Sequence, residues 1–271
     1  MSGHRESSES PRQSVLARLV AGTAVFGLGI RNARTAEIVR IARIAGFGLV
    51  WIDLEHSTMS IDCAAQIAAS AWDIGLEAWV RTPEREFGDI GRLLDGGASG
   101  IIAPGVETAD GARDVVEAAR FPPRGSRSRI ALLPQTGYRR LAPADLMRAA
   151  DETTSVHVLL ETRLGIENAN TIAAIDGVDM LHVGLNDLST DLGYTGDVNQ
   201  PEVLSACRTA IDAARRHGKL AVVGGWSKVS MLQDMVRAGA SPLLLAAIDT
   251  DILAAGLTQR AEEWRAAWPS P

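Results

Sequence analysis

The stretch FGLVWIDLEHS, from Phe47 to Ser57, joins an apolar run to a cluster of two acidic residues and a histidine. Its first part, Leu49 to Ile52, is apolar without alternation, which is typical of a strand buried on both faces in a parallel sheet. A helical pattern of small and apolar residues follows over 61–74. The stretch therefore predicts one strand–helix unit, with polar side chains at the carboxyl end of its strand.

The same unit recurs along the chain. Predicted strands cover residues 23–30, 48–53, 76–81, 100–106, 156–161, 179–184, 219–225 and 241–247. Predicted helices cover residues 35–46, 61–74, 87–97, 108–120, 143–151, 165–174, 201–217, 227–239 and 250–265. Eight strand–helix units in about 250 residues are typical of a single (β/α)8 TIM barrel.

A doubly wound parallel sheet is the alternative fold. It would normally carry a G-x-G-x-x-G turn after its first strand, and GLGIRN at residues 27–32 does not match that pattern. We predict a disordered tail over residues 1–12, which are polar and rich in serine, followed by one barrel domain over 13–271. The segments 121–141 and 188–200 are predicted to be irregular.

Composition and charge argue against several classes of protein. The 271 residues carry a net charge of −6, with no basic stretch interleaved with aromatic residues, so a nucleic-acid partner is not expected. No apolar run approaches the roughly 20 residues of a membrane helix, and the N-terminus lacks the apolar segment of a signal peptide. Cys63 and Cys207 lie far apart, which favours a reduced, cytoplasmic protein.

In a TIM barrel the active site forms at the carboxyl ends of the strands. Polar residues follow most of the predicted strands, and glycines near the ends of strands one and seven leave room for a ligand. These polar residues are Asp53, Glu55, His56, Arg81, Glu161, Asn186, Asp187 and Asp249. Taken singly, an Asp at such a position often caps a helix or holds a loop. Their joint occurrence at strand ends favours an active site.

The residue types at these ends point to enolate chemistry. Glu161 and Asp187 would supply two carboxylates from neighbouring strands, a donor set suited to Mg²⁺, with Mn²⁺ or Co²⁺ as substitutes. His56 is the candidate general base, with Asp53 three residues earlier to orient its ring and favour its protonated form. Arg81 would face a developing oxyanion. No strand-end lysine is available for a Schiff base.

Five motifs resemble, in order and spacing, those of the HpcH/HpaI family of metal-dependent class II pyruvate aldolases. They are IDLEHS (52–57), VRT (80–82), LLDGGASGIIAPGVETADGARDVVEAARFPPRG (93–125), LLETRLGIEN (159–168) and GLNDLSTDLGYTGD (184–197). The resemblance covers most of residues 15–265. It implies a (β/α)8 barrel in a trimeric or hexameric homo-oligomer. It also implies cleavage of 4-hydroxy-2-oxo acids to pyruvate, or a close analogue, and an aldehyde through a metal-bound enolate.

The resemblance also implies roles for individual residues. Glu161 and Asp187 resemble the metal ligands, His56 with Asp53 resembles the base and its support, and Arg81 resembles the contact to the pyruvyl keto oxygen. A further group is matched more loosely. Glu55 would hold a metal-bound water, the backbone amides around Asn186 and Asp187 would receive the pyruvyl carboxylate, and Asp95 would reach the site of a neighbouring subunit.

Three departures from the family pattern bear on substrate choice. Leu159 stands where the family often has Gln, and Leu185 with Asn186 alters the carboxylate pocket. The loop 124–140 lacks the family's glycines, and its Arg127 and Arg129 are candidates for the acceptor side of the site. We therefore predict that the second substrate is unusual. A decarboxylase of oxaloacetate type that generates the same enolate, a lyase of acyl-CoA type and a catalytically silent ligand-binding protein remain as alternatives.

Overall fold

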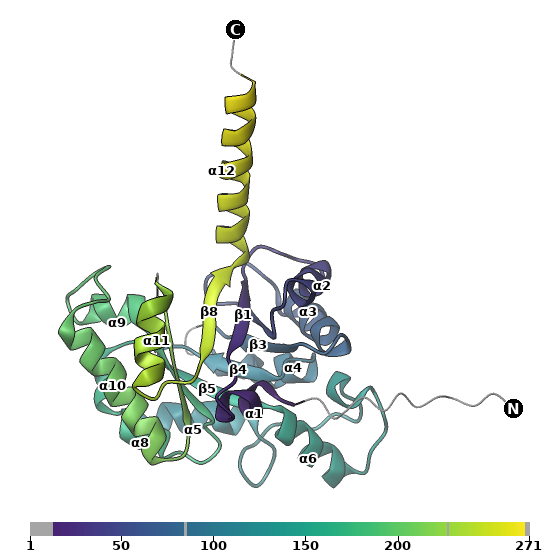
Figure 1. Ribbon diagram of the computed structural model, residues 1–271. Helices are drawn as coiled ribbons and strands as arrows, with labels where there is room; N and C mark the ends of the chain where they lie inside the picture. The colour runs from purple at the N-terminus through teal and green to yellow at the C-terminus, as the bar shows by residue number, and fades with distance from the viewer. Residues whose placement is uncertain (1–12, 84–85, 227, 269–271) are drawn as a thin grey trace, which may run out of the picture.

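Eight parallel strands form a barrel, as the sequence predicts. In the computed structural model, which describes residues 13–83, 86–226 and 228–268, the strands form one sheet in the order β7-β6-β5-β4-β3-β2-β1-β8 (Figure 1). The strands are β1 (Val25–Ile30), β2 (Leu49–Asp53), β3 (Glu77–Arg81), β4 (Gly100–Ala103), β5 (Ser155–Leu160), β6 (Met180–Gly184), β7 (Leu220–Gly224) and β8 (Leu243–Ile248). The alternative of a doubly wound sheet is thereby excluded.

The first and last strands of this sheet order, β7 and β8, meet and nearly close the barrel. The backbone N–H of Ser241, just before β8, donates to the carbonyl of Ala221 on β7 at 2.7 Å. On its other edge β8 pairs with β1, with an irregularity in register between Phe26 and Leu28. Closure brings all eight carboxyl ends to one face, which is where the sequence placed its polar residues.

Helices connect and surround these strands. The α-helices are α1 (Val15–Val20), α2 (Glu37–Ile44), α3 (Ile61–Asp73), α4 (Ile90–Asp95), α5 (Ala109–Ala119), α6 (Pro143–Thr153), α7 (Arg163–Glu167), α8 (Ala169–Ala173), α9 (Leu185–Asp191), α10 (Pro201–Arg216), α11 (Val229–Arg237) and α12 (Asp249–Ala267). Two 3₁₀ turns, Phe87–Asp89 and Pro134–Thr136, complete the set in the described chain. None of the described helices has the combination of length and apolar character needed to cross a bilayer.

Two short helices were not predicted. Helix α9 occupies the beginning of the segment expected to be irregular. Helix α1 precedes the first strand, where Ser14 caps its first turn, and the N–H of Val15 donates to the carboxylate of buried Glu77 at 2.7 Å. Val15 and Leu19 thereby join the apolar cluster inside the barrel, at the end opposite the active-site face. The predicted tail over residues 1–12 lies outside the described residues.

The last helix, α12, leaves the barrel instead of packing beside it (Figure 1). None of its residues is buried, and its large apolar side chains, followed by Trp268, are at least half exposed. Meanwhile an apolar groove of about 240 Å³ lies open over β1 and β8, lined by Phe26, Phe47, Leu244 and Ala247 among others. Within one chain, several large apolar side chains of α12 and an apolar groove are thus left uncovered.

Candidate active site

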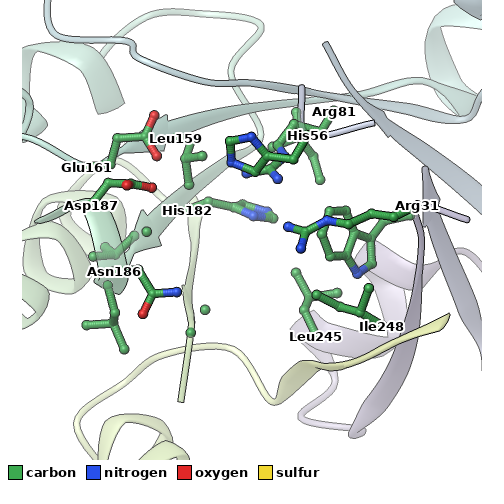
Figure 2. Close-up of a pocket in the computed structure, with 17 residues that line it drawn as sticks. Arg31, His56, Arg81, Leu159, Glu161, His182, Asn186, Asp187, Leu245 and Ile248 are labelled. Carbon is green, nitrogen blue, oxygen red and sulfur yellow. The ribbon is translucent and has the colours of Figure 1, made fainter. Parts of the chain in front are cut away.

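A cavity of about 390 Å³ opens at the carboxyl ends of the strands (Figure 2). Six of the candidate residues from the sequence line it: His56, Arg81, Glu161, Leu185, Asn186 and Asp187. Asp53, Glu55 and Asp249 contact residues of this lining. The lining residues are Arg31, Trp51, His56, Arg81, Ile102, Leu159, Glu161, His182, Val183, Gly184, Leu185, Asn186, Asp187, Gly224, Gly225, Leu245 and Ile248. The structure therefore brings the strand-end residues together around one space.

Asp53, the last residue of β2, is the buried anchor of this site. Its carboxylate accepts hydrogen bonds from Arg81 Nε at 3.0 Å and Nη2 at 2.7 Å, and from Arg31 Nε at 2.6 Å. Burial works to raise the pKa of Asp53, but these two arginines outweigh it and hold the pKa below its usual range. The group stays ionised and fixes both guanidinium groups.

The loop after β2 carries the base candidate. Asp53 Oδ1 accepts the backbone N–H of Glu55 and of His56, each at 3.2 Å, so it orders the loop. Among the described residues the ion pair of the His56 ring is with Glu55, and no hydrogen bond joins the ring to Asp53. The predicted orientation of the ring by Asp53 is replaced here by this backbone contact. The His56 imidazole is half exposed, and its Nε2 lies 3.7 Å from Glu55 Oε2, which pairs with Arg81 Nη1 at 2.8 Å.

Glu161 follows β5 and is mostly buried in the cavity. Its Oε1 accepts the backbone N–H of Gly105 at 2.8 Å. Burial raises the pKa of Glu161 to about 7, and the negative charges of Glu55 and Asp187 act in the same direction. A Cβ on Gly184 would lie 3.0 Å from Glu161 Oε2, so this glycine allows β6 to pass close to the carboxylate.

Asp187 lies in the first turn of α9, directly after β6. Leu185 is buried at the start of this helix, whereas Asn186 and Asp187 are exposed toward the cavity. Figure 2 shows Glu161, Asp187 and Asn186 on one side of the pocket. The predicted carboxylate pair is thus formed by neighbouring strands, β5 and β6, as expected from their order in the sheet.

The interior of the barrel below the cavity holds two histidines, His157 and His182, that were not predicted as site residues. His182 lines the cavity and stacks on His157, with ring centroids 5.0 Å apart, and His157 meets Trp79 edge to face at 4.1 Å. Burial lowers the pKa of His182 to about 3, so the ring is neutral. Leu159 lies in the same apolar interior cluster and gives this part of the cavity an apolar surface.

The residues predicted for the acceptor side and for a neighbouring subunit do not line this cavity. Arg127 Nη2 donates to Asp95 Oδ1 at 2.6 Å, and the guanidinium lies 4.6 Å above the Phe121 ring. Arg129 is exposed in the same loop. Within the described chain, no residue of the altered loop 124–140 lines the pocket. The role of Asp95 between subunits stays a prediction.

The donor set fits one hard divalent cation better than a closed metal cage. Over the described residues no group of three or more His, Cys, Asp or Glu side chains forms a metal site. Glu161 and Asp187 nevertheless share the cavity, and burial is the main cause of the raised pKa of Glu161. Among the described residues no ion pair is formed by either carboxylate, so both are available to a cation. Two carboxylates with open positions for water and substrate are typical of Mg²⁺.

Comparison with known proteins identifies the chain. A profile of the HpcH/HpaI aldolase/citrate lyase family matches residues 31–252. The chain belongs to this family. It is 38% identical over 248 residues to the 4-hydroxy-4-methyl-2-oxoglutarate aldolase tasA of Hapsidospora irregularis. The aligned residues cover 90% of this chain and 92% of that relative.

Two further matches support membership of the HpcH/HpaI family. The hydroxypyruvate/pyruvate aldolase of Roseovarius nubinhibens is 30% identical over 259 residues, covering 94% of this chain and 98% of the relative. The crystal structure of the HpcH/HpaI aldolase from Desulfitobacterium hafniense DCB-2 matches with a TM-score of 0.84 at 28% identity, covering 95% and 97% of the two chains. The chain is an aldolase, a carbon–carbon lyase, which confirms the predicted family, fold and enzyme class.

Proposed function

We propose that this aldolase uses a divalent metal ion, Mg²⁺ first and Mn²⁺ or Co²⁺ as substitutes, to cleave or form 4-hydroxy-2-oxo acids. One product is pyruvate or a close analogue, and the other is an aldehyde or related carbonyl compound. The observation that carries the proposal is the pair of carboxylates, Glu161 and Asp187, beside His56 and Arg81 in one cavity. The relatives named 4-hydroxy-4-methyl-2-oxoglutarate aldolase and 4-hydroxy-2-oxo-heptane-1,7-dioate aldolase support the substrate class.

The polar residues around the cavity have separate roles in this proposal. Glu161 and Asp187 would hold the metal, which supplies a Lewis acid when bound and favours negative charge on the substrate oxygens. Arg81, fixed by Asp53 and Glu55, would donate to the keto oxygen as it gains charge. The backbone amides at the start of α9, around Asn186, would receive the pyruvyl carboxylate.

The cleavage step needs one base. His56 takes the proton from the C4 hydroxyl, the C3–C4 bond breaks, and its electron pair passes into the enolate of pyruvate while C4 becomes a carbonyl. Protonation at C3 then gives pyruvate. His56 can act in this way because its ring lines the cavity and is half exposed. The reverse sequence forms the 4-hydroxy-2-oxo acid.

Metal removal tests the proposal. After chelation and dialysis, we expect the exchange of pyruvate methyl protons for deuterium to fall at least about 100-fold, because loss of the Lewis acid removes several kcal/mol of charge stabilisation. Adding back Mg²⁺, Mn²⁺ or Co²⁺ should restore the rate, which proton NMR follows directly. An exchange rate that is unaffected by chelation, or absent with all three metals, would overturn the proposal.

We also propose that the working form is a homo-oligomer, such as a trimer or hexamer. Support comes from α12, whose apolar side chains at Leu257 and Trp264 are exposed, and from the open apolar groove over β1 and β8. Burying such surfaces between chains would contribute roughly 25 cal/mol per Å² of apolar area. Sedimentation velocity on the full chain should show a species of three or more subunits, and a purely monomeric protein at micromolar concentration would contradict the proposal.

A further inference from the structure

Arg31, which directly follows β1, presents one edge of its guanidinium group to the active-site cavity. Its Nε donates to Asp53 Oδ2 at 2.6 Å. Its two η nitrogens have no acceptor among the residues that the structure describes, and Figure 2 shows this end of the side chain pointing into the pocket. The side chain keeps 28% of its surface accessible, whereas that of Asp53 is fully buried. The free edge is therefore available to a ligand.

The contact with Asp53 does not account for this arginine by itself. Asp53 already receives two hydrogen bonds from Arg81 and two from backbone amides. One carboxylate thus faces two guanidinium groups, and Arg81 has Glu55 as a second anionic partner. Within the described chain the guanidinium group of Arg31 pairs with no carboxylate besides Asp53, so the charge at its free edge is available for an anionic group of the substrate.

The backbone holds Arg31 in place from the other side. The carboxylate of Asp249, at the start of α12, accepts the backbone N–H groups of Arg31, Asn32 and Ala33 at 2.7 to 3.2 Å. Asp249 thus holds the loop after β1, which is one of the two structural roles expected of an Asp at a strand end. Arg31 is consequently fixed at its main chain by β8–α12 and at its Nε by β2. Binding a ligand would cost little conformational entropy, because the side chain is ordered beforehand.

The position of Arg31 indicates which part of the substrate it meets. Glu161, Asp187 and Asn186 lie on one side of the pocket, and Arg31 lies on the opposite side with Leu245 and Ile248 (Figure 2). A 4-hydroxy-2-oxo acid whose pyruvyl half contacts the first side extends its C4 end toward the second. A carboxylate attached to C4 would reach the free edge of the guanidinium, and the two aliphatic side chains would accept apolar atoms.

We propose that Arg31 is a specificity-determining residue that binds a carboxylate on C4 of the substrate. The second product is then a 2-oxo acid rather than a neutral aldehyde. This inference rests on the proposed function and adds the chemical class of the acceptor to it. It replaces the predicted acceptor-side candidates in the 124–140 loop with a residue that lines the cavity.

A matched pair of substrates tests the role of Arg31. 4-Hydroxy-2-oxoglutarate and 4-hydroxy-2-oxopentanoate differ only in a carboxylate against a methyl group on C4, and both release pyruvate, whose methyl signal proton NMR measures without interference from the second product. We expect wild-type protein to prefer the first in kcat/KM. In Arg31→Met this preference should fall about 10- to 100-fold, since a charge-assisted hydrogen bond is lost. The substitution also removes the hydrogen bond from Arg31 to Asp53. Any loss of activity from that change affects both substrates alike and cancels in the ratio of their kcat/KM values.

Two further variants separate recognition from charge and from structure. Arg31→Lys keeps the charge without the planar fork, so part of the preference should return. Arg40→Met removes one positive charge from the exposed face of α2, outside the cavity, and should leave the ratio within about twofold of wild type. A wild-type preference for 4-hydroxy-2-oxopentanoate, or equal losses on both substrates in Arg31→Met, would overturn the inference while the proposed function stands. Wild-type protein that cleaves neither substrate would overturn both.

Discussion

Replacing Glu161 with Gln is expected to lower metal-dependent exchange of pyruvate protons by about 10³-fold or more. The amide removes one of the two anionic oxygen donors in the cavity, and about 4 kcal/mol of Lewis-acid stabilisation corresponds to that factor. Calorimetric titration with Mn²⁺ should show the cause directly, because metal binding to the variant should be weakened below detection. The hydrogen bond from the Gly105 N–H can persist with the amide oxygen, so the local backbone has no reason to move.

The same substitution should not destabilise the metal-free protein. Burial raises the pKa of Glu161 to about 7 from its ordinary value of 4.5, so the folded state binds this proton more tightly than the unfolded state does. Stability is therefore lost as the pH rises from about 4.5 to about 7. Gln carries no charge to desolvate, so metal-free Glu161→Gln should be more stable than metal-free wild type at pH 8, on the order of 2 kcal/mol, with little difference at pH 4.

The combination of readouts makes this prediction specific. Thermal unfolding of wild type should shift upward on adding Mn²⁺, because the metal binds the folded state, whereas the variant should not shift. Glu167→Gln on the exposed end of α7 is the matched control, which should keep exchange, metal binding and stability close to wild type. Full metal binding by Glu161→Gln would remove Glu161 from the proposed ligand set.

The arrangement of strands could be predicted because each one is an apolar run between recognisable helices. Position in the sheet then follows from the order of the units, and so does the meeting of Glu161 with Asp187. Helix α9 was missed since its seven residues contain Ser, Thr and Asp and lead into the loop residues of 192–200. The sequence could predict a helix over 250–265 but not that α12 leaves the barrel, because packing partners are not encoded in helical period.

The contacts of single side chains were less accessible from sequence. Asp53 looked like a partner of the His56 ring from its spacing of three residues, yet the carboxylate is taken up by Arg81, Arg31 and backbone amides. Arg31 was not predicted as a site residue because its two partners, Asp53 and Asp249, lie 22 and 218 positions away in the chain. A positive residue directly after the first strand was the available signal, since that strand end reaches the same face as the others.

His56→Ala is expected to lower both proton exchange and aldol cleavage by about 10²- to 10⁴-fold, the usual contribution of a positioned general acid or base. The reason is structural: the imidazole lines the cavity, is half exposed, and lies 3.7 Å from Glu55 without being buried in a contact that the fold needs. The substitution should therefore leave the unfolding midpoint and Mn²⁺ binding close to wild type. Deuterium exchange followed by proton NMR measures the first effect.

Chemical rescue distinguishes a base from a structural histidine at this position. Since the ring is half exposed, free imidazole should enter the space that Ala leaves and restore part of the exchange rate, with saturation at high concentration. His217→Ala provides the matched control, because His217 is also exposed but lies at the end of α10, outside the cavity, and should neither lose activity nor respond to imidazole. An His56→Ala protein that keeps more than about a tenth of the wild-type rate would transfer the role of base to another group in the cavity.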